Sequence, residues 1–324
     1  MKRIPFVLLA LLLSGVACSD DSEGPKKEGE SDPVTLTLSD PNATEETKAL
    51  YSNLWAIQSK GFMFGHHDDL MYGRTWYGTE GGSDTKAVCG DYPAVYSFDF
   101  AEHIDDRHAS DPDAQALRLR GSDGKLIPVI FRPFHEHTQT WSWWGASCTT
   151  TEEFVNLWKF TVKYLRDTKG VHNFIYAISP QMDSAKTVDD FYFRWPGDEW
   201  VDFVGMDCYQ GINNAVFVTN LKAISKVSLA KLKPCGVTET GVEGFTATDY
   251  WTTNIHAPLT GRRVSMVVTW RNKYDPMESG THYFSVFPGH PSERDFVKMY
   301  NQENSFFCSD LPDMYTPAEN VTVL

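Results

Sequence analysis

The stretch "LIPVIFRPFHEHTQTWSWWG" (126–145) joins an apolar run to a cluster of polar and aromatic residues. Residues 126–131 are apolar throughout, which is typical of a parallel strand covered on both faces. A rigid Arg132-Pro133 step follows, then the pair His135-Glu136 and three tryptophans within residues 141–144. The stretch therefore predicts a buried strand whose end presents a carboxylate and a large aromatic surface.

The same pattern recurs along the chain, with helical segments between the apolar runs. The other candidate strands are 62–65, 93–100, 173–180, 201–209, 234–241 and 264–270. The clearest helix is 151–169, where Thr150 and Glu153 form a capping-box pattern and Gly170 ends the helix. This alternation predicts an α/β fold, a (β/α)8 TIM barrel. Polar residues at the carboxyl ends of its strands would meet on one rim, where barrel enzymes carry their chemistry.

Composition limits the classes of partner. The formal net charge is −14, so nucleic acid is not expected, because phosphate binding needs a basic surface. Aromatic residues make up 14% of the chain, and flat aromatic side chains suit the binding of a neutral polymer such as a polysaccharide. We expect a monomer.

The first residues resemble a bacterial lipoprotein signal peptide, which we assign to residues 1–17. Lys2 and Arg3 are basic, and the apolar run 6–13 is too short to span a membrane. Cys18 would become the lipid-bearing N-terminus. Gly15 stands where such signals usually have a larger apolar residue, so an ordinary cleaved signal peptide is the alternative.

The segment after Cys18 is polar and rich in glycine, proline and charge, and it begins with an acidic run. Such a segment cannot bury a core, so residues 18–40 are expected to be a flexible tether and residues 41–324 the catalytic barrel. The acidic start resembles that of Bacteroidetes lipoproteins. We therefore expect an outer-membrane lipoprotein, at the cell surface or in the periplasm, that meets the membrane only through its lipid.

Two glutamates stand out because each follows an apolar run. Glu136 follows "LIPVIF" and Glu239 follows "CGVT". Two carboxyl groups about 5–5.5 Å apart across a sugar can act as acid/base and nucleophile of a retaining glycosidase, and tryptophan planes stack on sugar rings. The alternative is that each is an ordinary solvated or ion-paired carboxylate at a strand end. The run His66-His67-Asp68-Asp69 could suggest a metal, but consecutive residues on one loop rarely supply a complete site, so neither a metal nor a cofactor is expected.

Several motifs together resemble the family 26 glycoside hydrolases, which are chiefly β-mannanases. They are "FRPFHEHTQTWSWWG" (131–145), "GHHDDLMYGRTWYG" (65–78), "GDYPAVYSFDF" (90–100), "VDFVGMDCYQ" (201–210), "TETGVEG" (238–244) and "VVTWRN" (267–272). They occur in family order over residues 61–324. The resemblance implies a (β/α)8 barrel of the retaining clan, with Glu136 as the acid/base and Glu239 as the nucleophile.

The resemblance also implies roles for residues around the two glutamates. His135 would bind the sugar beside the cleavage point, and Tyr209 would hydrogen-bond the nucleophile. Trp141 would form a platform on the leaving-group side, and Trp270 would stack beneath the cleaved sugar.

Two further residues would contact the non-reducing side of the substrate. His66 would line that side, and Arg271 would contact the next sugar out. The chain departs from the family at His67, where glutamine is frequent.

The implied activity is that of a retaining endo-β-1,4-mannanase acting on β-mannan, galactomannan or glucomannan. A β-1,3-xylanase or mixed-linkage glucanase of the same family is the enzymatic alternative. A mannan-binding lipoprotein without turnover is the non-enzymatic one.

One interval is too short for the family pattern. Residues 99–126 stand where the family has a helix, a third strand and another helix, and a β/α unit needs roughly 30 residues or more. The third strand of the family ends in a Trp-His step, which this interval lacks. We count seven strands. Either the third β/α unit is deleted, which we favour, or another segment closes a compact variant of the barrel; a deletion would put activity in doubt.

Overall fold

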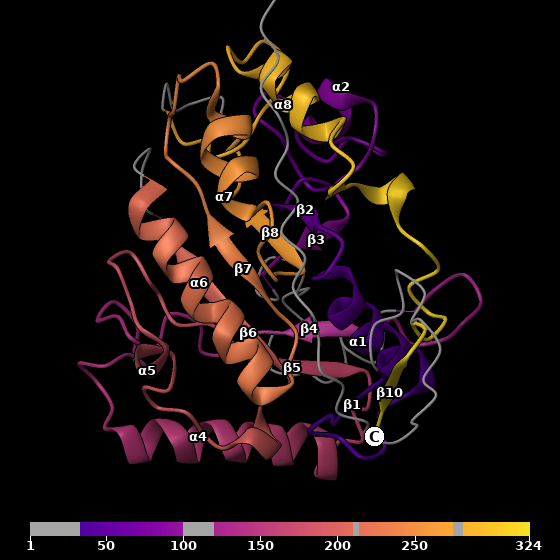
Figure 1. The fold of residues 1–324 in the computed structure, drawn as a ribbon, viewed down its shortest axis with the longest axis vertical. Helices are drawn as coiled ribbons and strands as arrows, with labels where there is room; N and C mark the ends of the chain where they lie inside the picture. Colours follow the sequence, from indigo (N-terminus) through magenta and orange to yellow (C-terminus); the bar gives the residue numbers. More distant parts are fainter. Residues whose placement is uncertain (1–32, 100–119, 210–213, 275–280) are drawn as a thin grey trace, which may run out of the picture. The chain divides into compact units, whose positions relative to one another are not determined.

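The computed structural model describes residues 33–99, 120–209, 214–274 and 281–324. Seven parallel strands form its main sheet, in the order β3-β2-β8-β7-β6-β5-β4 (Figure 1). Their bounds are β2 (Phe62–His67), β3 (Val95–Ser97), β4 (Val129–Phe131), β5 (Phe174–Ile178), β6 (Phe203–Cys208), β7 (Cys235–Thr240) and β8 (Met266–Thr269). The seven predicted strands are confirmed, and the sheet order is that of a barrel in which each strand is joined to the next by a crossover.

The sheet path ends at β3 and at β4, the two strands that flank the short interval. β3 pairs with β2 and β4 pairs with β5, and no strand between them occurs among residues 33–99 and 120–324 as far as the structure describes them. Most of the interval, residues 100–119, lies outside the described residues. The choice between a deleted third unit and a compact variant falls in that segment.

Three short strands were not expected. β9 (Ser305–Phe306) pairs in parallel with the first residues of β2. β1 (Val34–Leu36) and β10 (Val321–Val323) form a separate parallel pair. Their few residues give too weak an alternating pattern to be recognised from sequence.

The pairing of β1 corrects the expected boundary between tether and folded unit. Val34–Leu36 pairs with Val321–Val323, and the backbone N–H and hydroxyl of Ser39 donate to the Asp202 carboxylate at 2.6 and 2.7 Å. The folded unit therefore includes residue 34 onward, instead of starting at residue 41. The predicted signal peptide and Cys18 lie outside the described residues.

Helices accompany the strands in alternation. Their bounds are α1 (Glu45–Ile57), α2 (Asp84–Cys89), α4 (Thr151–Lys163), α5 (Val188–Phe191), α6 (Asn214–Lys231), α7 (Ala257–Leu259) and α8 (Glu293–Tyr300). No helix among these described segments is both long and apolar enough to cross a membrane.

The predicted helix after residue 150 is confirmed in detail. Thr150 and Glu153 form the capping box, which satisfies N–H groups that the first helical turn leaves without partners. α4 continues into a π-helical turn, Tyr164–Thr168, and the chain then reverses at Gly170, whose φ of 65° suits glycine. Its fully buried residues, among them Phe154 and Trp158, pack against β5.

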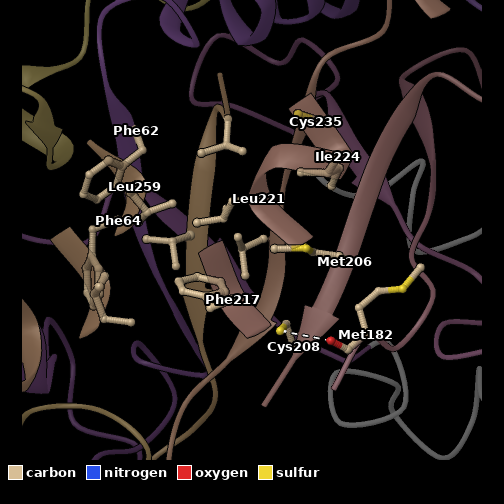
Figure 2. Close-up of a cluster of buried hydrophobic side chains, with 14 of the residues drawn as sticks. Phe62, Phe64, Met182, Met206, Cys208, Phe217, Leu221, Ile224, Cys235 and Leu259 are labelled. Atoms are coloured by element: carbon tan, nitrogen blue, oxygen red, sulfur yellow. Dashed lines mark hydrogen bonds between the residues drawn. The ribbon is translucent and has the colours of Figure 1, made fainter. Parts of the chain in front are cut away.

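The largest core cluster lies between α6 and the strands β2, β6 and β7. Phe217, Leu221 and Ile224 of α6 pack against Met206 and Cys208 of β6 (Figure 2). Burial of each large apolar side chain contributes roughly 1.5–3 kcal/mol, so this layer holds β6 and β7 firmly in place. The carboxyl ends of these strands carry the polar residues of the next section.

Candidate active site

Glu136 and Glu239 come together although their strands are not neighbours. Carboxylate oxygens of Glu136, Asp207 and Glu239 all lie within 4.8 Å of one another. β4 and β7 are three places apart in the sheet, and neighbouring strands are spaced about 4.8 Å, so a flat sheet would separate them by roughly 14 Å. The sheet must therefore curl, as a barrel does, to bring the two glutamates together.

Glu136 lies just beyond β4, in an unusual backbone conformation. Its φ is 51°, in the left-handed region, and its N–H donates to the carbonyl of Ser179 at 2.8 Å. Such a conformation costs a non-glycine residue on the order of 1–3 kcal/mol, and it is concentrated at functional sites. The bond to Ser179, which follows β5, helps to hold the turn that directs Glu136 toward Glu239.

The surroundings of Glu136 raise the pKa of its carboxyl group above the usual value. Burial raises its pKa most, and the nearby charge of Glu239 raises it further. The indole N–H of Trp141 donates to Glu136 Oε2 at 2.7 Å and opposes the shift. The net direction is upward, which suits a group that must donate a proton.

Glu239 has the opposite tendency. Burial alone would raise its pKa, but the guanidinium of Arg132, which donates to Oε1, holds it below its usual value. The Tyr209 hydroxyl donates to Oε2 at 2.7 Å and acts in the same direction. Burial raises the pKa of Tyr209 itself, so this phenol stays a neutral donor. Glu239 is therefore held ionised, as a nucleophile must be.

Arg132 and Asp207 are components of the site that the sequence did not single out as functional. Arg132 bridges Glu239 and Asp207, and its Nη1 lies 2.7 Å from Asp207 Oδ2. The Thr238 hydroxyl donates to Asp207 Oδ1 at 2.6 Å. The sequence signal that could have indicated this role was an arginine at a strand end, followed by proline. A guanidinium buried there needs carboxylate partners.

The same geometry bears on the question of a metal. By spacing alone, the three carboxylates could surround a cation. Arg132 already contributes the positive charge to two of them, Asp207 and Glu239. The protein therefore supplies its own counter-charge at this point.

His135 is neutral at ordinary pH. Burial and the charge of Arg132 lower its pKa to about 4. Its ring centre lies 5.4 Å from that of Trp141, and its carbonyl accepts the Trp144 indole N–H at 2.8 Å. A neutral imidazole beside Glu136 and Glu239 can exchange hydrogen bonds with a sugar hydroxyl without adding charge.

The three tryptophans of residues 141–144 differ in burial. Trp144 packs against the α4 cluster, whereas Trp143 and Trp141 are 62% and 57% exposed. The indole N–H of Trp141 is fixed on Glu136, so its exposed ring stands at the edge of the carboxylate pair. Trp270, just after β8, stacks on His67 with ring centres 4.1 Å apart. The roles of Trp141 and Trp270 as sugar platforms stay predictions.

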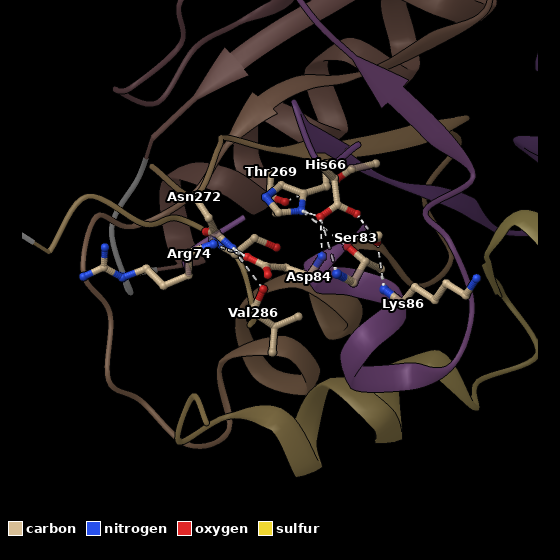
Figure 3. A network of polar contacts seen from close by, with 12 residues as sticks. His66, Arg74, Ser83, Asp84, Lys86, Thr269, Asn272 and Val286 are labelled. Atoms are coloured by element: carbon tan, nitrogen blue, oxygen red, sulfur yellow. Dashed lines mark hydrogen bonds and ion pairs between the residues drawn. The ribbon is translucent and has the colours of Figure 1, made fainter. Parts of the chain in front are cut away.

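His66 is completely buried, at the centre of a polar network beside β2 (Figure 3). Its Nδ1 lies 2.9 Å from Asp69 Oδ1, and Asp69 also accepts from the Ser83 hydroxyl and the Asp84 N–H. Its Nε2 has no hydrogen-bond partner in the part of the chain that the structure describes. His66 therefore helps to hold the loop after β2, and a direct contact with the non-reducing side of a substrate stays a prediction.

The same network joins the loops that follow β2 and β8. Asp84 accepts from the Trp76 indole at 2.9 Å. It also accepts from the Arg74 N–H and the Asn272 amide at 2.7 and 2.9 Å (Figure 3). Because Asn272 directly follows Arg271 in the chain, the network also fixes the backbone position of Arg271.

Arg271 is anchored by an aromatic neighbour on the loop after β2. Its Nη1 donates to the Tyr72 hydroxyl at 3.2 Å, and that hydroxyl donates to Asp68 at 2.6 Å. Arg271 also lies 5.7 Å from the ring centre of Trp270. These contacts fix the guanidinium of Arg271, while its contact with the next sugar stays a prediction.

The fold is of the (β/α)-barrel class, and it brings Glu136 and Glu239 together beyond the carboxyl ends of its strands. A family model for glycosyl hydrolase family 26 matches residues 39–118 and 111–242. The chain therefore belongs to glycosyl hydrolase family 26. The two matched segments meet inside the interval 99–126 that the sequence marks as short.

Solved structures of the same family are similar over most of the chain. A GH26 β-mannanase from Bacteroides ovatus is 32% identical, with a TM-score of 0.76, and the match covers 85% of this chain and 98% of that one. The catalytic domain of a GH26 endo-β-1,4-mannanase from Bacillus sp. JAMB-750 is 25% identical, with a TM-score of 0.80 and 92% and 100% coverage. These matches support the barrel fold.

A curated relative is the mannan endo-1,4-β-mannosidase of Bifidobacterium adolescentis. It is 34% identical over 218 residues, which are 63% of this chain and 20% of that protein. A Bacillus subtilis enzyme of the same name is 32% identical over 130 residues, 38% of this chain and 33% of that protein. The matches thus span a fifth to a third of these relatives' length.

Proposed function

We propose that this protein is a retaining endo-β-1,4-mannanase that hydrolyses β-mannan, galactomannan or glucomannan. One observation carries the proposal: Glu136 and Glu239 are within 4.8 Å, and their environments push their pKa values in opposite directions. Retaining glycosidases need carboxyl groups about 5–5.5 Å apart, one protonated and one ionised.

Hydrolysis proceeds in two steps. Glu239 attacks the anomeric carbon, while Glu136 gives its proton to the departing glycosidic oxygen, so a covalent glycosyl-enzyme forms and the leaving chain departs as an alcohol. Glu136, now ionised, takes a proton from water, and the water oxygen attacks the same carbon and releases Glu239. Two inversions return the β configuration. Tyr209 keeps the attacking oxygen of Glu239 oriented through its 2.7 Å bond.

The neighbouring residues bind the polymer. Trp141 stacks on the leaving-side sugar and Trp270 on the sugar that is cleaved, while His135 bonds a hydroxyl beside the cleavage point. Arg271 contacts the next sugar toward the non-reducing end, with His66 behind it. The role of Trp141 is supported by the bond of its indole to Glu136. The role of Trp270 is supported by its backbone N–H, which donates to the carbonyl of Thr240, the residue after Glu239.

The choice of mannan as substrate is supported by the relatives. The Bifidobacterium adolescentis and Bacillus subtilis proteins are both named mannan endo-1,4-β-mannosidases. The Bacteroides ovatus structure is titled a β-mannanase.

A panel of polymers tests this function. Reducing-sugar release is measured on β-mannan, β-1,3-xylan and mixed-linkage glucan, with Glu239→Gln as a folded, inactive control. Release from mannan above the level on the other polymers is expected. Release mainly from xylan or glucan would assign one of those activities, and mannan binding without release from any polymer would mean a binding protein.

We further propose that the protein is a monomeric outer-membrane lipoprotein anchored through Cys18. The proposal is supported by the apolar run 6–13 ahead of Cys18 and by the acidic segment behind it. Cys18→Ala should release the protein from membranes, whereas Cys148→Ala, which removes an exposed thiol of the folded unit, should not. A Cys18→Ala protein that stays with membranes through a high-salt wash would refute the anchor. Light scattering after detergent removal of lipid should give the mass of one chain.

A further inference from the structure

A cavity lies at the end of the barrel opposite to Glu136 and Glu239. It has a volume of about 860 Å³ and is formed by the segments 58–61, 259–263 and 301–304. These segments lead into β2, β8 and β9, which are all parallel strands of one sheet. The cavity is therefore at the amino ends of the strands, and the two glutamates are at the carboxyl ends.

The deepest polar residue of this cavity is Gln58, which is 2% exposed. Its Oε1 accepts the backbone N–H of Cys235 at 2.8 Å, a bond that only the amide oxygen can make. That bond fixes the orientation of the amide, so the amide nitrogen is turned away from Cys235. Gln58 Nε2 is buried and has no hydrogen-bond partner within the described part of the chain.

Two arginines form the adjoining wall. The Nε atoms of Arg262 and Arg263 are buried and, among the described residues, also lack hydrogen-bond partners. Arg263 lies over the ring of Trp55 at 4.9 Å, and its carbonyl accepts from the Ser225 hydroxyl at 3.2 Å. These two contacts hold Arg263 in place without using its Nε–H group.

The charge of the cavity is opposite to that of the protein. Lys60, Arg262 and Arg263 line it, with Glu303 as its one acidic residue. The chain as a whole has a formal net charge of −14. A local cluster of basic side chains attracts anions even when the net charge of the protein is negative.

The lining combines the basic side chains Lys60, Arg262 and Arg263 with buried donors behind it, so the complementary ligand is an anionic acceptor. Buried donors without partners cost free energy, and bonds from guanidinium groups are strongest with oxyanions, which accept them in pairs. We propose that this cavity is a binding site for an oxyanion, either a small free ion such as phosphate or the acidic group of a sugar. The site is separate from the proposed hydrolysis, because it lies at the other end of the strands.

Calorimetric titration of the intact protein tests the proposal. The probes are inorganic phosphate, sulfate and D-glucuronate, each compared with sodium chloride at equal ionic strength. The double variant Lys60→Gln/Arg262→Gln removes two cavity charges, and neither side chain has a described packing role. The matched control Lys222→Gln/Lys226→Gln removes the same charge from exposed positions of α6 that do not line the cavity.

Saturable binding of at least one probe is expected, weakened about tenfold or more in the cavity variant and unchanged in the α6 control. Stronger binding of phosphate than of glucuronate would identify a free ion, and the reverse would identify an acidic sugar. Circular dichroism and the thermal midpoint without added anion show whether the variants are folded. No saturable heat with any of the three probes, or equal binding by a folded cavity variant, would overturn the proposal.

Discussion

Replacing Arg132 with methionine tests how the two glutamates are kept in different protonation states. Arg132 is a largely buried side chain that donates to both Glu239 and Asp207. Methionine keeps a long apolar stem but removes the charge and the donors. Burial raises the pKa of Glu239, and the charge of Arg132 is the main influence that lowers it. Without that charge the pKa of Glu239 should rise.

The size of the shift follows from the bond that is lost. A hydrogen bond to a charged group contributes about 1.5–3 kcal/mol, and one pKa unit corresponds to about 1.36 kcal/mol. The pKa of Glu239 should therefore rise by about 1–2 units. Because Glu239 must be ionised to attack, the acidic limb of the kcat/KM profile should move up by the same amount, with the basic limb, set by Glu136, moving much less.

Stability should change with pH in a defined direction. Loss of Arg132 leaves the carboxylates of Asp207 and Glu239 buried without their cation, which costs about 3–5 kcal/mol when both are ionised. In the variant their folded-state pKa values are raised, so the folded state binds more protons than the unfolded state. Its stability therefore falls as pH rises through those values and recovers on acidification.

The assay is kcat/KM on an aryl mannobioside across the acidic and neutral range, together with urea unfolding at each pH. Arg132→Lys is the control, because lysine keeps the charge but cannot bridge two carboxylates as a planar fork, so its shift should be smaller. A folded, active Arg132→Met protein whose acidic limb stays at the wild-type pH would show that Arg132 does not set the ionisation of Glu239.

Two further substitutions test separately the hydrogen bond that each glutamate accepts from a neighbouring aromatic side chain. Trp141→Phe keeps an aromatic ring but removes the N–H that opposes the upward shift at Glu136, so the basic limb of the kcat/KM profile should move to higher pH. Trp143→Phe, at an equally exposed ring without that bond, should leave the limb in place; equal profiles for both variants would contradict the assignment. Tyr209→Phe removes one of the donors to Glu239 and should lower kcat about tenfold to a hundredfold, from roughly 1.5–3 kcal/mol, with little change in the unfolding midpoint. An unchanged kcat would mean that the hydroxyl does not orient the nucleophile.

Much of the fold was predictable because it depends on local patterns. Continuous apolar runs identify strands buried on both faces, and the capping box at Thr150 marks the start of α4. The strand-end positions of Glu136 and Glu239 were likewise readable, since parallel strands bring their carboxyl ends to one rim.

The remainder depends on contacts between distant segments. Arg132 and Asp207 are 75 residues apart, and nothing local shows that they share a bond. The pairing of β1 with β10 joins the two ends of the folded unit, so the residues near Val34 look like part of a tether until their partner is known. The burial of His66 depends on Asp69 and Ser83, which reach it only once the loop after β2 has folded.

The most direct test of the account is azide rescue of the two glutamate variants. Glu136→Ala lacks the acid/base, so an activated aryl mannobioside should still form the glycosyl-enzyme on Glu239, which then breaks down slowly. Azide needs no general base, so it should speed that breakdown and give a β-mannobiosyl azide, identified by NMR. Glu239→Ala lacks the nucleophile and should give no β-azide from the same substrate. A β-azide from Glu239→Ala and none from Glu136→Ala would contradict the central claim, because it would mean that the two roles are reversed.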